Sequence, residues 1–187
     1  SAKIFTESII GQVVSTEPNL KIQNTKNSFD KNYKHICLGI SASGATKRWC
    51  IDNYIKLCKE LMKIRNCKFY IAAGKNDIDL INKIKNSDIG NNCKSFEKLS
   101  IKETLPIIKN CDCYIGSDTG FAHLSVALGI KSLTLFMDSP VMAYGKYSSR
   151  MVTVEPEGEK DSTKHDTLGK DKISLNSVLS EAIKLLN

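Results

Sequence analysis

Short apolar runs alternate with segments of helical periodicity along most of the chain. The runs are rich in aliphatic, aromatic and cysteine residues and are bounded by polar or glycine-containing stretches, as buried strands are. They predict strands at residues 35–41, 68–74, 111–116 and 131–136. Apolar residues spaced three and four positions apart predict helices at 52–64, 77–86 and 174–187. Strands separated by helices imply right-handed crossovers and a mostly parallel sheet, so we predict a Rossmann-like three-layer α/β domain.

Two polar signals locate helix starts. Asp52 stands where the cap of the helix at 52–64 is expected. Ser100 and Glu103 have the spacing of a capping box, but Pro106 is poorly suited to the interior of a helix that begins there. That helix therefore starts either after Ser100 or nearer Thr104.

The first 34 residues differ from the rest of the chain. "FTESIIGQVV" (5–14) has the pattern of a helix, whereas "NTKNSFDKNYK" (24–34) is polar and typical of a linker. We assign residues 1–34 to a linker or the end of an N-terminal domain, and residues 35–187 to the Rossmann-like domain. The charged stretch at 155–171 predicts a long surface loop.

Length and composition set the class of protein. A chain of 187 residues suits one α/β domain and is short for two. Hydrophobic residues make up 41% and charged residues 25%, and the sequence has no apolar stretch of membrane-spanning length. The first residues also lack the pattern of a signal peptide. These features predict a soluble, cytoplasmic protein.

The net charge of +7 permits a nucleic acid, an anionic surface or an acidic small ligand as partner. The lysines are spread over every segment and no nucleic-acid motif is present, which favours a solvated basic surface without a nucleic-acid partner. The seven cysteines lie mostly in apolar runs and are typical of reduced core residues. Cys111 and Cys113 lack the paired spacing of a zinc site, so no metal is predicted.

Polar residues follow three of the predicted strands, in "SASGATKRW" (41–49), "GKND" (74–77) and "GSDTGFAH" (116–123). In a parallel sheet these stretches meet at one edge, where ligands of such sheets bind. In the third, a sharp turn leads into a helix whose first N–H groups have no intrahelical partner, so it suits a phosphate. Gly120 allows close approach, Thr119 adds a hydroxyl, and His123 a donor one turn later. A simple Asp or Thr helix cap beside a buried histidine is an equal alternative.

The other two stretches add charge. "SASGATKRW" places Ser43 and Lys47 on a small-residue loop, and Lys47 is the natural counter-charge to a diphosphate. It is not the phosphate loop of nucleotide hydrolases, because Ala45 stands where that motif requires lysine. In "GKND", Asp77 is placed either to accept hydrogen bonds from a ribose diol or simply to cap the next helix.

A hydrolase uses the same turn differently. G-x-D-x-G at 116–120 has the form of a nucleophile elbow, with Asp118 as a nucleophile that forms an ester intermediate. That scheme needs a histidine base from late in the chain. His165 is the candidate, within the predicted loop.

The order of these motifs resembles the C-terminal half of glycosyltransferase family nine, the ADP-heptose:lipopolysaccharide heptosyltransferases, which have the GT-B fold. The resemblance extends from "EPNLKI" (17–22) to the last helix and is most specific in "GISASGATKRW" (39–49) and "SDTGFAHLSVALGIKSLTLF" (117–136). The chain departs from the family in two places. Asp77 stands where glutamate is common, and "MDSP" (137–140) replaces a Gly-Pro-Thr-like turn.

The resemblance implies the roles of site residues. Lys47 and the turn at Thr119 and Gly120 would contact the diphosphate of a nucleotide sugar, with Ser43 near the phosphates. Asp118 and His123 would lie near the transferred sugar and the phosphates, and Asp77 near the ribose.

The resemblance also implies the activity. The chain would bind an ADP-heptose-like donor without metal or cofactor, and its own N-terminal domain would supply the acceptor site and the general base. Alone it would be inactive. The expected acceptor is a lipid-linked saccharide of lipopolysaccharide type, reached by peripheral contact with the inner face of the cell membrane. A non-catalytic nucleotide-sugar-binding module stays open beside the hydrolase.

Overall fold

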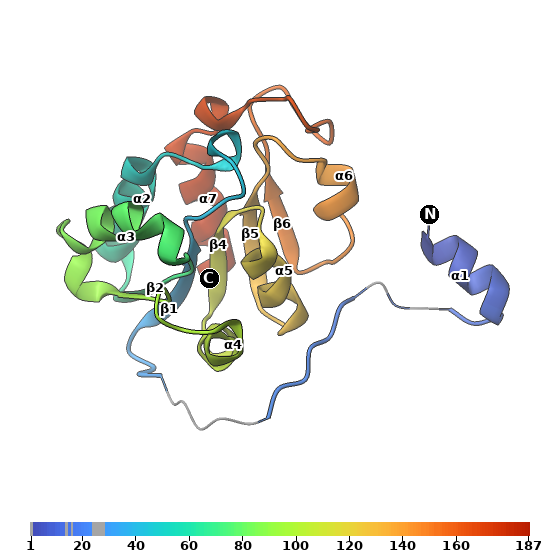
Figure 1. Ribbon diagram of the computed structural model, residues 1–187, viewed down its shortest axis with the longest axis horizontal. Coiled ribbons are helices and arrows are strands. Elements are labelled where there is room, and N and C mark those ends of the chain that lie inside the picture. Colours follow the sequence, from blue (N-terminus) through green and yellow to red (C-terminus); the bar gives the residue numbers. More distant parts are fainter. Residues whose placement is uncertain (1, 14, 16, 24–28) are drawn as a thin grey trace.

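The computed structural model describes residues 2–13, 15, 17–23 and 29–187, and it contains a six-stranded sheet with helices on both faces (Figure 1). The strands are β1 (Lys34–Gly39), β2 (Cys67–Ile71), β3 (Cys93–Ser95), β4 (Cys113–Ser117), β5 (Lys131–Leu135) and β6 (Met151–Val154). The helices are α1 (Ala2–Ile10), α2 (Ile51–Ile64), α3 (Ile78–Lys85), α4 (Ile101–Lys109), α5 (Gly120–Ala127), α6 (Val141–Tyr144) and α7 (Leu175–Leu186). Within these ranges no helix combines the length and the apolar character needed to cross a membrane.

The strands lie in the order β3-β2-β1-β4-β5-β6, and each recorded pairing is parallel. Successive strands run outward from β1 to β3, and the chain then returns to pair β4 with the other side of β1. This arrangement confirms the predicted Rossmann-like α/β class. The reversal of strand order lies between β1 and β4.

Alternate residues of each strand point to opposite faces of the sheet and fill two cores. Ile36 and Leu38 of β1 belong to the core under α2, α3 and α7, whereas Cys37 between them belongs to the core under α4 and α5. β4 alternates in the same way, with Tyr114 on the second face. Because both faces are covered, β4 is buried along its whole length and β1 from His35 onward.

The structure shows where the two helices with predicted caps, α2 and α4, begin. The cap of α2 is Cys50, and Asp52 lies inside its first turn, so the cap predicted at Asp52 was wrong. α4 begins at Ile101 although Pro106 lies within it. The Ser100 hydroxyl accepts from Glu103 N and the Glu103 carboxylate accepts from Ser100 N. These two bonds satisfy free N–H groups and offset the bond lost at the proline.

The elements that the pattern missed are short. β3, β6 and α6 have three or four residues each, too few for a period to be recognised.

The loop predicted at 155–171 is largely irregular, but hydrogen bonds hold it in place. Glu155 accepts from Asp161 N and from Thr163, and Gly169 N donates to Met137 O.

Hydrogen bonds and an ion pair attach described residues of the segment before β1 to the domain. Glu17 accepts hydrogen bonds from Ser148 and Ser149 and pairs with Arg150 at 3.1 Å. Leu20 N donates to Ala127 O at 2.7 Å. α1 covers part of the helix predicted at 5–14 and lies apart from the sheet in Figure 1. Residues 24–28 of the predicted linker and residue 14 of that helix lie outside the described residues, and the boundary between 34 and 35 stays a prediction.

Candidate functional site

Four polar loops meet at the carboxyl-terminal edge of the sheet, after β1, β2, β4 and β5. β1 and β4 are neighbours at the reversal of strand order, where doubly wound sheets open a crevice for ligands. Gly39 of β1 pairs there with Gly116 of β4. A Cβ on Gly39 would lie 1.7 Å from the Tyr114 hydroxyl oxygen, and a Cβ on Gly116 would lie 2.5 Å from the Gly39 Cα. The close approach of the two strands therefore requires glycine at both positions.

Asp118 and His123 form a polar pair at this edge. Asp118 follows β4, His123 lies in the first turn of α5, and the distance from His123 Nε2 to Asp118 Oδ1 is 3.2 Å. The other carboxylate oxygen accepts a hydrogen bond of 2.7 Å from Ser139, which joins the loops after β4 and β5. The side chain of His123 is 37% exposed and that of Asp118 is 11% exposed. The pair is thus open to a ligand on its histidine side.

Thr119 stands at the start of α5 with extended backbone, at φ −149°. Within the part of the chain that the structure describes, its side chain makes no capping hydrogen bond to that helix. Its hydroxyl instead lies 3.4 Å from the hydroxyl of Tyr114, which also donates to Ser117 O at 2.8 Å. The predicted capping bond from Thr119 therefore does not form. A hydrogen-bond acceptor from a ligand can reach the free N–H groups at the amino-terminal end of α5.

The loop after β1 presents Ser43 and Lys47. Ser43 is exposed, and Lys47 ends the short helix η1 (Ala45–Lys47), half-buried. Asp138, from the loop after β5, lies close enough to Lys47 for their charges to interact. Burial opposes ionisation of Asp138, but hydrogen bonds from Thr46 and from the backbone of Leu168 and Asp166, with the Lys47 charge, outweigh it and lower the pKa of this carboxyl. Asp138 therefore holds the loop of Lys47 against the loop at 155–171.

Asp77 is 8% exposed and is bound mainly by the protein. Its Oδ2 accepts from Ser41 Oγ at 2.8 Å and from Gly74 N at 3.2 Å, and its Oδ1 pairs with Arg48 at 3.5 Å. The carboxylate thus joins the loop after β1 to the loop after β2. The two side chains that bind Asp77, Ser41 and Arg48, both belong to the loop after β1. These bonds are therefore explained neither by the predicted contact to a ribose nor by the predicted cap on α3.

In the described ranges there is no group of three or more His, Cys, Asp or Glu side chains arranged to hold a metal ion. All seven cysteines are free thiols, and five of them are buried, at positions 37, 58, 67, 111 and 113. Burial raises the pKa of Cys67 to about 11, which keeps this thiol protonated.

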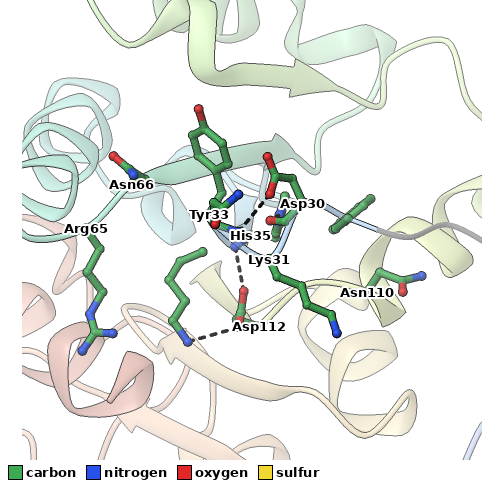
Figure 2. A pocket seen from close by; sticks show the side chains of 11 residues that line it. Asp30, Lys31, Tyr33, His35, Arg65, Asn66, Asn110 and Asp112 are labelled. Atoms are coloured by element: carbon green, nitrogen blue, oxygen red, sulfur yellow. Dashed lines mark hydrogen bonds and ion pairs between the residues drawn. The ribbon is translucent and has the colours of Figure 1, made fainter.

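A hollow of about 640 Å³ lies at the opposite, amino-terminal edge of the sheet (Figure 2). Hydrogen bonds and an ion pair involve three of the groups that line it, His35, Lys34 and Asp112. His35 Nδ1 lies 3.0 Å from the Tyr70 hydroxyl and His35 Nε2 2.8 Å from Asp30 O, while Asp112 accepts from His35 N and pairs with Lys34. These bonds fasten the segment before β1 to the sheet. A second hollow shares part of this lining. Among the described residues, the lining of neither hollow includes any of the seven residues predicted to bind the sugar donor.

Several residues around the predicted site were not assigned a role from the sequence. Tyr114, Asp138, Ser139 and Tyr147 all contact or neighbour predicted site residues. Asp138 and Ser139 follow a strand, so the same strand-end argument would have found them. Tyr147 follows α6 in an irregular segment, so no sequence spacing could relate it to His123.

His165, the base that a hydrolase would need, is exposed in the loop at 155–171. The histidine beside Asp118 is His123.

The family model of glycosyltransferase family 9 (heptosyltransferase) matches residues 7–172. The chain is also 25% identical over 179 residues to lipopolysaccharide heptosyltransferase 1 of Campylobacter coli, covering 91% of this chain and 51% of that protein. It therefore spans about half the length of the curated relative it matches.

Solved structures show the same fold. ADP-heptose LPS heptosyltransferase II of E. coli superposes with a TM-score of 0.67 at 20% identity, over 85% of this chain and 48% of that one. E. coli heptosyltransferase WaaC with ADP superposes with a TM-score of 0.71 at 13% identity, over 85% and 46%. The chain thus covers about half the length of each of these two structures. The family match over most of the chain, together with this fold, shows that the chain belongs to glycosyltransferase family 9.

Proposed function

We propose that this chain is the donor-binding domain of a heptosyltransferase and that it binds a nucleoside diphosphate sugar, ADP-heptose or a close relative, at the carboxyl ends of β1 and β4. The observation that carries the proposal is the amino-terminal end of α5. It lies at the reversal of strand order, and the Asp118–His123 pair stands beside it. Among the described residues, the Thr119 side chain makes no capping hydrogen bond to it. The E. coli structure that contains ADP has the same fold, which supports a nucleotide ligand.

The site residues divide by charge. Lys47, Ser43 and the turn at Thr119 and Gly120 offer positive charge and hydrogen-bond donors to the diphosphate. Asp118 is an acceptor for sugar hydroxyls, with His123 beside it. Asp77 lies on the side of the ribose, where it shapes the pocket through its bonds to Ser41 and Arg48.

The reaction we propose is transfer with inversion. An acceptor hydroxyl, deprotonated by a carboxylate that this chain does not supply, attacks the anomeric carbon, and the bond from that carbon to the diphosphate oxygen breaks. Lys47 and the dipole of α5 stabilise the negative charge that develops on the departing nucleoside diphosphate. The acceptor is a lipid-linked saccharide at the cytoplasmic face of the membrane, where a basic surface is attracted to anionic lipids. The chain alone binds donor and does not transfer the sugar.

Calorimetric titration with ADP, UDP and GDP tests the proposal. We expect saturable binding of ADP and weaker binding in Lys47→Ala, by about tenfold or more, because a charge-assisted hydrogen bond contributes roughly 1.5–3 kcal/mol. Thr119→Val should also weaken binding, whereas Thr119→Ser keeps the hydroxyl and should retain it. Lys131→Ala is the matched control, since Lys131 is exposed at the start of β5, on the opposite edge of the sheet.

Absence of nucleotide binding by the folded wild-type chain would contradict the proposal. Equal losses in Lys47→Ala and Lys131→Ala would also contradict it, because they would show that the general positive charge, and not this site, attracts the nucleotide.

A further inference from the structure

The hydroxyl of Tyr147 lies 2.7 Å from Nδ1 of His123, on the side of the imidazole that faces away from Asp118. We propose that Tyr147 is a positioning residue, which fixes the proton of His123 on Nε2 and directs that N–H toward the donor site. The chemistry of this hydrogen-bonded row follows from the geometry alone. Its role in donor binding rests on the function proposed above.

The row Tyr147–His123–Asp118 specifies one tautomer. A tyrosine hydroxyl has one proton to donate, and an ionised carboxylate can only accept. Burial, and then the charges of Asp118 and Glu17, raise the pKa of Tyr147, so its hydroxyl stays protonated at neutral pH. With Nδ1 as its acceptor, the imidazole proton lies on Nε2, 3.2 Å from Asp118 Oδ1. The other tautomer would lose the bond from tyrosine and turn a lone pair toward the carboxylate.

Protonation of His123 does not change which atom faces the site. In the imidazolium both ring nitrogens carry protons, so Nδ1 would donate to the tyrosine oxygen while Nε2 would still donate toward Asp118. The bond to Tyr147 therefore keeps an N–H on Nε2 in both charge states.

Tyr147 is itself held in place from both sides. Its ring stacks on the imidazole with centroids 5.6 Å apart and an interplanar angle of 28°. The next residue, Ser148, is buried and donates to Glu17 of the segment before β1. At the other end of the row, Ser139 fixes Asp118 Oδ2. A side chain held in this way orients its partner without loss of rotamer entropy on ligand binding.

This arrangement leaves one imidazole donor for a ligand. Nδ1 is occupied by Tyr147, and the bond from Nε2 to Asp118 is long at 3.2 Å. A phosphate oxygen or sugar hydroxyl that approaches the exposed part of His123 can therefore share the Nε2 proton. Tyr147 would act on the donor only through this proton and would not touch the donor itself.

Nitrogen NMR of the histidine side chains tests the proposal. The chain has three histidines, and the signals of His123 are identified by their loss in His123→Gln. At about pH 8, where an ordinary imidazole is neutral, wild type should show a protonated Nε2 and an unprotonated Nδ1. Tyr147→Phe keeps the ring and removes the hydroxyl, and it should raise the ratio of the Nδ1–H to the Nε2–H form by about fivefold, the loss of one net hydrogen bond. Tyr144→Phe, at an exposed tyrosine in α6, should leave both signals unchanged.

The same variants are then titrated with ADP. We expect Tyr147→Phe to weaken binding about fivefold, while Tyr144→Phe binds as wild type does. Wild-type nitrogen shifts in a folded Tyr147→Phe, or a protonated Nδ1 in neutral wild type, would overturn the assignment. If the tautomer shifts and ADP affinity does not, the role in donor binding is overturned. If wild type binds no nucleotide although the tautomer shifts, the hydrogen-bonded row is upheld and the proposed function fails.

Discussion

Glycine at positions 39 and 116 sets how closely β1 and β4 approach one another beneath the site. Tyr114 occupies the space that a side chain on Gly39 would need, and its hydroxyl reaches Ser117 O and the Thr119 hydroxyl. The tyrosine that excludes a larger residue at position 39 is therefore the one that supports the turn before α5. The size of the residue at position 39 therefore affects the shape of the turn before α5.

We expect Gly39→Ala to lower the free energy of unfolding by at least about 2 kcal/mol, because Tyr114 is fully buried and cannot move away from the added methyl group. Urea unfolding of the variant and of wild type measures the difference. Gly44→Ala is the matched control in the next loop, since the nearest atom to its added Cβ would be 3.9 Å away. A loss in Gly39→Ala no larger than in Gly44→Ala would contradict the proposed link.

Residues at the ends of strands were the part of the site that the sequence could predict. Parallel strands share a carboxyl-terminal edge, so "GSDTGFAH" and "SASGATKRW" had to meet there whatever the loops did in detail. The partners of each side chain could not be predicted in this way. Asp77 binds Ser41 and Arg48, and His123 binds Tyr147, because of loop conformations that no local pattern encodes.

At the scale of elements, the irregular segments are fixed by carboxylates. Glu17 ties the segment before β1 to residues 148–150. Asp77 joins the loops after β1 and β2, and Asp138 joins the loop after β1 to the loop at 155–171. The long helices and central strands were predicted because their apolar periods extend over several residues. β3, β6 and α6 were missed because pairing and packing define them instead. The loop at 155–171 was predicted, but its anchors at Glu155 and Asp138 were not.

The hydrogen bonds and ion pair of Glu17 should make part of the free energy of unfolding depend on pH. Hydrogen bonds from Ser148 and Ser149 and the charge of Arg150 lower the pKa of Glu17 from 4.5 to about 2. A carboxyl whose folded pKa is lowered stabilises the fold above its unfolded pKa, and this contribution is lost as the pH falls toward the folded value. We expect wild type to be more stable than Glu17→Gln by a constant amount above pH 4.5, and the difference to close between pH 4.5 and about 2.

Urea unfolding of both proteins across this pH range is the measurement. The control is Glu157→Gln, at an exposed glutamate of the loop after β6. A difference between wild type and Glu17→Gln that stays constant down to the lowest pH would mean that Glu17 is not held as the structure describes.

At the scale of the whole molecule, the N-terminal segment has two parts with different relations to the domain. In α1, Ile4, Phe5 and Ile9 are each more than 60% exposed, and the helix lies apart from the sheet. Residues 17–22 lie on the domain, where Glu17 binds residues 148–150, and Leu20 and Ile22 pack on the core under α4 and α5. Residues 17–22 therefore pack against the domain, whereas α1 does not lie on the sheet.

Two truncations separate these parts. Removal of residues 1–12 should change the free energy of unfolding by no more than about 0.5 kcal/mol, because the apolar side chains of α1 are mostly exposed. Removal of residues 1–23 should lower it by about 2 kcal/mol or more, since it also removes two packed side chains and the Glu17 anchor. Denaturant unfolding of the three proteins measures both effects. Equal stability of all three would show that residues 17–22 do not contribute to the fold.

The strand order also bears on how the chain folds. β1, β2 and β3 and the helices between them come from one continuous stretch, residues 34–95, so their pairings close short loops. The pairing of β1 with β4 joins segments much farther apart in the chain, and such contacts form slowly. The site that we propose for the donor lies at that junction. We therefore expect one half of the sheet to gain protection from hydrogen exchange first, and the nucleotide site to be completed only when the second half docks.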